Sequence, residues 1–199
     1  MINKEQTHTL VRRALRLGAT DAGAISPADI AVDNKLADLC NADPGCEHYG
    51  LAPGCPPHVS GPAGFRQWIK KSAAAIVVRI DVPTAALFSD QRREIMQLLH
   101  ETVAGVESKA VEIGFVGSQA FAGGSCKQIF CHDQPDCPVL SGQGKCRHPQ
   151  SARPSMSGFG IDVARLMQSA GWSVEKAAPE NAADAQSMSW VAGLVLAVP

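Results

Sequence analysis

The chain has 199 residues, enough for one domain with a sizeable core, and we expect that domain to span residues 1–199. Its 18 Lys and Arg residues nearly balance its 19 Asp and Glu residues, so the formal charge is -1. Such a balance excludes a strongly charged surface, and aromatic residues make up only 5% of the chain. Composition therefore predicts that neither nucleic acid nor an anionic membrane is the partner.

The N-terminal segment, MINKEQTHTLVRRALRLG, carries charges throughout and lacks the apolar stretch of a secretory signal. The longest apolar runs, residues 73–78 and 191–198, are too short to span a bilayer. These observations favour a cytoplasmic location, where thiols stay reduced. The cysteines number seven, and an odd number also disfavours a pure disulfide framework.

The first half of the chain predicts two helices and two strands. Residues 5–17 place apolar side chains at helical spacing, and Gly18 is expected to end this helix. A short strand is predicted at residues 20–26 and a second helix at residues 32–39. Residues 73–82, AAAIVVRIDV, are typical of a strand that is buried on both faces of a covered sheet.

The second half opens with a long helix, which we expect to be capped by Ser89 or Asp90 and to end at Gly114. The remaining strands and one helix are predicted, in chain order, at residues 115–121 (strand), 161–169 (helix), 172–176 (strand) and 190–198 (strand). Alternating helices and strands predict a compact α/β domain in which helices cover a mixed sheet.

All the cysteines fall in two loops that are rich in Gly and Pro and lack apolar periodicity. The first Cys loop, residues 40–64, contains Cys40, Cys46 and Cys55. The second Cys loop, residues 123–157, contains Cys126, Cys131, Cys137 and Cys146. Structural cysteines are usually scattered through core elements, whereas a turn-rich loop can arrange its thiolates around a metal. The pattern therefore predicts two metal-binding loops.

Four thiolates complete either a zinc tetrahedron or an iron–sulfur cubane, and the second Cys loop supplies four by itself. Pro follows Cys55 and Cys137, as it follows the last cysteine of bacterial ferredoxin runs. No C-x2-C pair occurs, so the spacing matches neither zinc ribbons nor ferredoxins. We expect one or two [4Fe–4S] clusters, with zinc as the alternative.

The first Cys loop offers only three cysteines, so its fourth ligand is open. His58 is the best candidate, because it follows Cys55 as C-x2-H. His48, His132 and His148 are interpreted as loop residues that donate hydrogen bonds. A cysteine from the other loop is an alternative ligand, and a site without a fourth ligand would leave one iron open to a substrate.

Arg147, Arg153 and Ser155 surround the last cysteine and are candidate cofactor-binding residues. Cations and N–H groups near a thiolate cluster stabilise its negative charge. The same residues also fit a pocket for an anionic substrate, or an ordinary solvated loop.

Four segments carry a resemblance to a known family: C-x8-C-P-P-H at residues 46–58, GGSCKQIFC at 123–131, CRHPQSARPSMSGFGIDV at 146–163 and GLVL at 193–196. With these segments the chain resembles the predicted metal-binding proteins called domain of unknown function 2284, from about residue 18 to its end. The resemblance implies metal binding at the seven cysteines, and it implies no settled reaction.

Three functions follow from these residues. The first is a redox protein, a candidate iron–sulfur oxidoreductase, that transfers electrons to a partner protein or reduces a small-molecule substrate. The second is a structural zinc module in which metal orders two loops. The third is a sensor or carrier that holds exchangeable metal. The sequence leaves the oligomeric state open.

Overall fold

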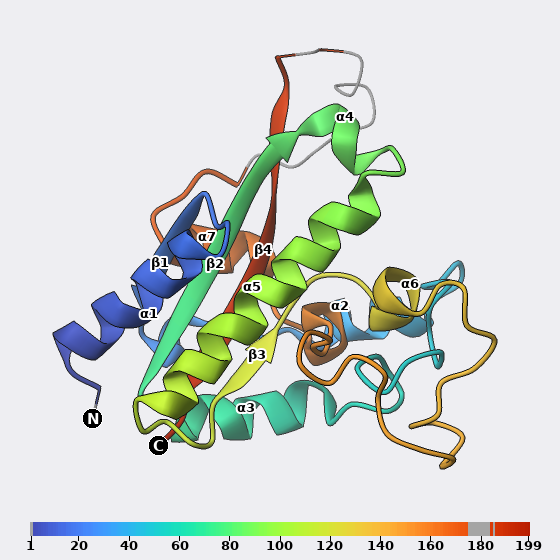
Figure 1. Cartoon of the computed structure of the whole chain (residues 1–199), viewed down its shortest axis with the longest axis horizontal. Coiled ribbons are helices and arrows are strands. Elements are labelled where there is room, and N and C mark those ends of the chain that lie inside the picture. Colours follow the sequence, from blue (N-terminus) through green and yellow to red (C-terminus); the bar gives the residue numbers. More distant parts are fainter. Residues whose placement is uncertain (1, 175–183, 185) are drawn as a thin grey trace.

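The computed structural model describes residues 2–174, 184 and 186–199. Within them, one sheet has the strand order β1-β2-β4-β3, with the bounds β1 (Asp21–Ile25), β2 (Ala74–Pro83), β3 (Gln119–Phe121) and β4 (Met188–Ala197) (Figure 1). All three strand pairings are antiparallel, whereas the sequence predicted a mixed sheet. Element order does not determine strand direction, because a connecting helix can return the chain at either end of the sheet. The α/β class is confirmed, and the extent of one domain stays a prediction.

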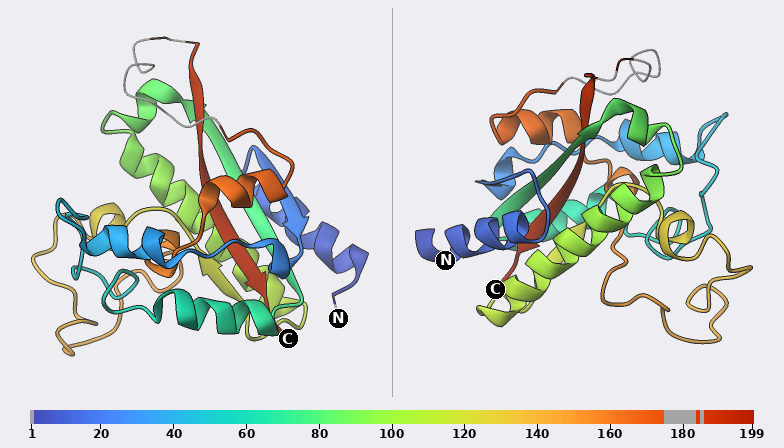
Figure 2. Two further views of the ribbon diagram at one scale, coloured as in Figure 1. Left: turned by 180° about the vertical axis from the view of Figure 1, so that it is seen from behind. Right: turned by 45° about the horizontal axis from the view of Figure 1, so that its top comes forward.

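Helices cover both faces of the sheet, as Figures 1 and 2 show. One face carries α1 (Lys4–Arg16) and α5 (Arg92–Glu112); the other carries α3 (Gly61–Lys71), α7 (Val163–Ser169) and the short 3-10 helix η3 (Met156–Phe159). Side chains alternate between faces along a strand. In β2, Ile76 and Val78 therefore join the core beneath α1 and α5, while Val77 joins the core beneath α3. This explains the apolar run that predicted a doubly buried strand.

Several predicted boundaries needed correction. The helix α5 begins after Gln91 without a side-chain cap, and the Oγ atom of Ser89 instead accepts a hydrogen bond from the Gln91 N–H. The strand predicted at residues 115–121 is shortened to β3, because residues 115–118 form a turn. Residues 172–174 form no strand, and the rest of the range 172–176 lies outside the described residues.

Several helices were not predicted. These are η1 (Pro27–Asp29), η2 (Leu39–Asn41), α3, α4 (Thr84–Leu87), α6 (Cys126–Phe130) and η3. Four of them, η2, α3, α6 and η3, lie inside or beside the Cys loops. The helix predicted at 32–39 is the shorter α2 (Asn34–Asp38), which continues directly into η2. The first Cys loop, predicted to extend to residue 64, ends at residue 60, because α3 begins at Gly61. Across the described ranges, no helix combines the length and apolar character that crossing a bilayer requires.

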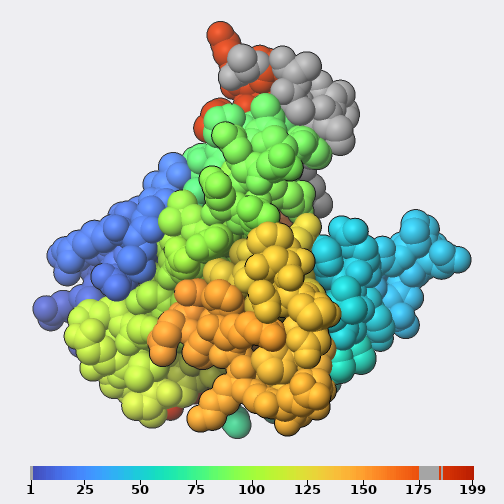
Figure 3. Space-filling view, turned by 45° about the vertical axis from the view of Figure 1, so that its right-hand side comes forward, coloured from blue at the N-terminus to red at the C-terminus, as the bar shows by residue number. Residues whose placement is uncertain are grey.

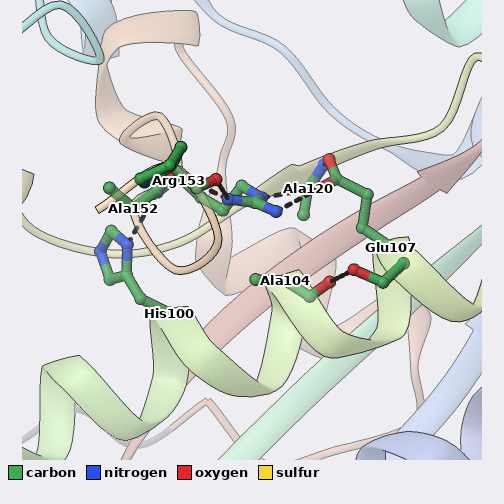
Figure 4. Close-up of polar contacts among 8 residues, drawn as sticks. His100, Ala104, Glu107, Ala120, Ala152 and Arg153 are labelled. Carbon is green, nitrogen blue, oxygen red and sulfur yellow. Dashed lines mark hydrogen bonds and ion pairs between the residues drawn. The ribbon is translucent and has the colours of Figure 1, made fainter. Parts of the chain in front are cut away.

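A buried histidine on α5 joins the two ends of the second Cys loop. The Nε2–H of His100 donates to the carbonyl oxygen of Gly123 at 3.0 Å. Figure 4 shows the second bond, in which the Arg153 N–H donates to Nδ1 at 3.1 Å. His100 is fully buried, and this burial lowers its pKa to about 4. The ring is therefore neutral, with one nitrogen donating and the other accepting.

A second contact from α5 secures the same loop end. The Glu107 carboxylate forms an ion pair with the Arg153 guanidinium, with Oε2 2.6 Å from Nη2, and its Oε1 accepts from the Ala120 N–H at 2.7 Å (Figure 4). The Nη1 of Arg153 donates to the carbonyl oxygens of Ala152 and Pro149. The end of the second Cys loop is thus tied to α5 and to β3.

The protein should become less stable as the pH is lowered, because His100 is buried in its neutral form. The unfolded chain protonates this residue below pH 6.5, whereas the folded chain does so only near pH 4. The unfolded state therefore binds more protons between these values, and acidification should lower the free energy of unfolding by about 3 kcal/mol. Urea unfolding of the wild type, His100→Gln and the exposed control His8→Gln checks this. An unchanged pH slope in His100→Gln would contradict it.

The Glu107→Ala substitution should be strongly destabilising, because it leaves the largely buried Arg153 guanidinium without its carboxylate partner. Breaking such a pair costs about 3 kcal/mol or more. The matched control is Glu112→Ala, which removes the exposed pair with Lys109 on the same helix, and should cost under about 1 kcal/mol. Urea unfolding measures both, and equal losses would refute the structural role of Glu107.

Candidate metal centres

Three cysteines of the first Cys loop line one cleft, here called the first-loop cleft. Cys40 lies in η2, and Cys46 and Cys55 lie in the turns that follow. The Cys46 N–H donates to the Cys40 carbonyl oxygen at 3.2 Å, and the Cys55 N–H donates to the Ala52 carbonyl oxygen at 3.0 Å. Residues of other segments complete the cleft, among them Arg92, Ser125, Gln128, Ser155 and Asp162.

The thiols of the first-loop cleft influence one another. Burial raises the pKa of Cys40, and the neighbouring Cys46 and Cys55 raise it further. Burial also raises the pKa of Cys55, although the adjacent Ser125 hydroxyl partly opposes this shift. Uncompensated thiolates are therefore unfavourable here, whereas a bound metal cation would stabilise them.

Four cysteines of the second Cys loop line another cavity, here called the second-loop pocket. Its cysteines are Cys126, Cys131, Cys137 and Cys146. The short helix α6 separates the first two, since Cys126 is its first residue and Cys131 its C-cap. Burial raises the pKa of Cys126 to about 12, and charges on Cys55 and on the other three thiols add to this shift. The thiol of Cys55 and those of the other three second-loop cysteines therefore lie near enough to Cys126 to disfavour its charged form.

Positive groups and N–H donors surround the second-loop pocket. Burial raises the pKa of Cys131, and the Arg147 guanidinium opposes the shift. Arg147 lines the pocket and is held by Asp136, whose carbonyl oxygen accepts from Nη1 at 2.9 Å. The backbone N–H of His148 donates to the Cys146 sulfur at 3.3 Å. The imidazole ring of His148 stacks on the ring of Phe130. These contacts favour thiolate charge at this site.

The two Cys loops lie side by side and contribute to each other's cavities, as Figure 3 shows for the surface they share. Residues 51–53 line the second-loop pocket, and residues 124–125 line the first-loop cleft. The Gly54 carbonyl oxygen accepts from the Ser155 N–H at 2.9 Å. A Cβ atom on Gly54 would lie 3.0 Å from the Pro154 Cα, so the two segments are too close for a side chain there.

The other predicted site residues occupy different places. His58 is exposed, lines neither cavity, and has its Nε2 3.1 Å from the Gly50 carbonyl oxygen. Arg153 also lines neither cavity, because its guanidinium is bound to Glu107. Ser155 lines the first-loop cleft, and Arg147 lines the second-loop pocket. Cofactor binding by these residues stays a prediction.

The donor set fits a metal group, although no single-ion site is preformed. In the portion of the chain that the structure describes, no three His, Cys, Asp or Glu side chains are placed to hold one metal ion. Two buried polar atoms in that portion, His48 Nε2 and Ser125 Oγ, lack a hydrogen-bond partner, and both residues line the first-loop cleft. Soft thiolates beside unsatisfied donors suit iron–sulfur or zinc chemistry.

Sequence reasoning missed the residues that position the second Cys loop. His100 and Glu107 lie on the same helical stripe as the buried Met96 and Val103, at spacings of three, four and seven. Polar residues within an otherwise apolar helical stripe could have indicated that these two side chains bind other buried groups. His48 was interpreted as an ordinary loop residue, and its proximity to Cys46 was the signal for its place in the cleft.

Comparison with known proteins agrees with this geometry. A family model described as "Predicted metal-binding protein (DUF2284)" matches residues 23–196, which include every cysteine and both cavities. No curated protein and no solved structure matches the chain. Because the family model covers most of its length, the chain belongs to DUF2284, a family of predicted metal-binding proteins.

Proposed function

We propose that the protein holds [4Fe–4S] clusters on its cysteines and uses them to transfer electrons or to reduce a small molecule. The observation that carries this proposal is the second-loop pocket, which four cysteines line and in which their charges act on Cys126. Thiolates suppressed by burial and mutual repulsion need a positive centre, and the family supports metal as that centre. Such clusters supply one-electron redox chemistry.

A single ion and a cluster require different arrangements of the thiols. A zinc ion requires four ligands around one point, at about 2.3 Å for sulfur. In a [4Fe–4S] cluster each thiolate binds a different iron atom, so the thiolates need not approach a common point. Pro follows Cys55 and Cys137, as it follows the last cysteine of bacterial ferredoxin runs, and this favours the second arrangement.

The two cavities support different roles. The second-loop pocket has four cysteines, which suits a fully ligated cluster that passes electrons. The first-loop cleft has three cysteines and is lined by polar groups such as Arg92, Gln128 and Ser155, which suits a centre that meets a small polar substrate. The redox partner and the cytoplasmic location belong to the same proposal, since reduced thiols are needed.

A zinc module or metal carrier is the second candidate, because the first-loop cleft also contains His48. Three cysteines and one histidine are a common structural zinc set. In that case metal would order the two loops without redox consequence.

Protein purified without oxygen should be brown and contain iron and sulfide in equal amounts. Cys137→Ser and Cys46→Ser should each remove about half of both, because each variant disrupts one of two centres. Ser151→Ala is the control, since Ser151 is in the second Cys loop but lines neither cavity. Metal and sulfide analysis checks the result, and colourless protein with stoichiometric zinc would reject the iron–sulfur proposal.

Replacing Arg147 by Met should lower the reduction potential of the second-loop cluster. Reduction adds negative charge, and Arg147 is the cation whose charge most favours thiolate at Cys131, with Lys127 next. The control is Arg66→Met, because Arg66 bonds to Asn34 and Val32 and lines neither cavity. Redox titration followed by absorbance compares them; a potential that stays at the wild-type value in Arg147→Met would argue against this cluster position.

A further inference from the structure

The first-loop cleft lacks a fourth cysteine, and the contacts around it point to the side chain that completes it. This inference rests on the proposed metal centre at Cys40, Cys46 and Cys55. His58 is poorly placed, because its ring is exposed and its Nε2 is engaged with the Gly50 carbonyl oxygen at 3.1 Å. Cys126 lines the second-loop pocket, which would be left with three cysteines without it.

His48 has the opposite environment. It lines the same cleft as the three cysteines and follows Cys46 by two residues. Its side chain is only 21% exposed, and its Nε2 atom is buried without a hydrogen-bond partner. The nearest carboxylate oxygen, Oε1 of Glu47, is 3.3 Å away, makes no hydrogen bond of good geometry, and belongs to a side chain that is 80% exposed. The buried nitrogen is therefore unsatisfied.

Ser125 lines the same cleft and is 3% exposed. Its hydroxyl interacts with the Cys55 thiol and lowers the pKa of that thiol, but among the described residues no hydrogen bond of good geometry reaches its buried Oγ. Leaving a buried polar atom unpaired costs about 1 to 3 kcal/mol. His48 and Ser125 thus both line the cavity that three thiols also line, and the unpartnered imidazole nitrogen of His48 indicates a bound group there.

We infer that the Nε2 atom of His48, and not that of His58, is the fourth protein ligand of the first-loop metal centre. The Ser125 hydroxyl is then placed beside Cys55 to donate a hydrogen bond to its coordinated sulfur. A neutral imidazole in place of a thiolate makes a cluster less negative and raises its reduction potential. The two centres of one chain would therefore differ in potential, with the first-loop centre the better electron acceptor.

The test uses the full chain, purified without oxygen, as wild type, His48→Gln, His48→Cys and His58→Gln. Pulsed electron paramagnetic resonance of the reduced protein should detect a strongly coupled nitrogen in the wild type and in His58→Gln. This coupling should be lost in His48→Gln and in His48→Cys. His48→Gln should also lose first-loop iron to a chelator several-fold faster than the wild type, whereas His48→Cys should retain the iron at a lower potential.

The outcomes separate this inference from the proposed function. If Cys46→Ser loses iron but His48→Gln keeps the nitrogen coupling and the wild-type iron retention, the His48 assignment is overturned and the cysteine centre stands. If Cys46→Ser contains as much metal as the wild type, the first-loop centre itself is rejected. Circular dichroism of each variant confirms that the fold is retained, so that loss of metal reports on ligation.

Discussion

The position of the second Cys loop depends on one buried histidine. His100 accepts from the backbone at Arg153 and donates to the backbone at Gly123, so a single neutral ring joins both ends of a loop that has almost no apolar core of its own. The Glu107–Arg153 ion pair secures the same end against α5. Because α5 packs on the sheet through buried side chains, both ends of the loop that carries the four thiols have defined positions.

The pKa values of the cysteines follow from the way the two loops pack together. Packing the loops together buries thiols beside one another, and both burial and mutual repulsion disfavour their charged forms. Arg147 and the N–H of His148 act in the other direction at the second-loop pocket. The charge of seven thiolates gathered toward two cavities would be compensated by a bound cationic group, in keeping with a predicted metal-binding family.

Much of the fold was predictable because its signals are local. The apolar stripe of α1, the doubly buried run of β2 and the glycines after α1, α5 and α7 each reflect interactions within a few residues of chain. The short helices in the Cys loops were not predictable, since α6 is five residues long and is stabilised by its neighbours. Strand direction was also missed, because it depends on pairing across the sheet.

The sequence by itself determined the family, the α/β class and the two groups of cysteines, since thiols gathered in loops without apolar periodicity are visible in one dimension. Only the tertiary structure decided which other candidate side chains lie at the cysteine cavities and which lie elsewhere. It placed Arg153 against Glu107, turned His58 outward and set His48 in the first-loop cleft. The reason is that the direction of a loop side chain follows from contacts with segments distant in sequence. One such contact joins Gly54 to Ser155, and others join α5 to both ends of the second Cys loop.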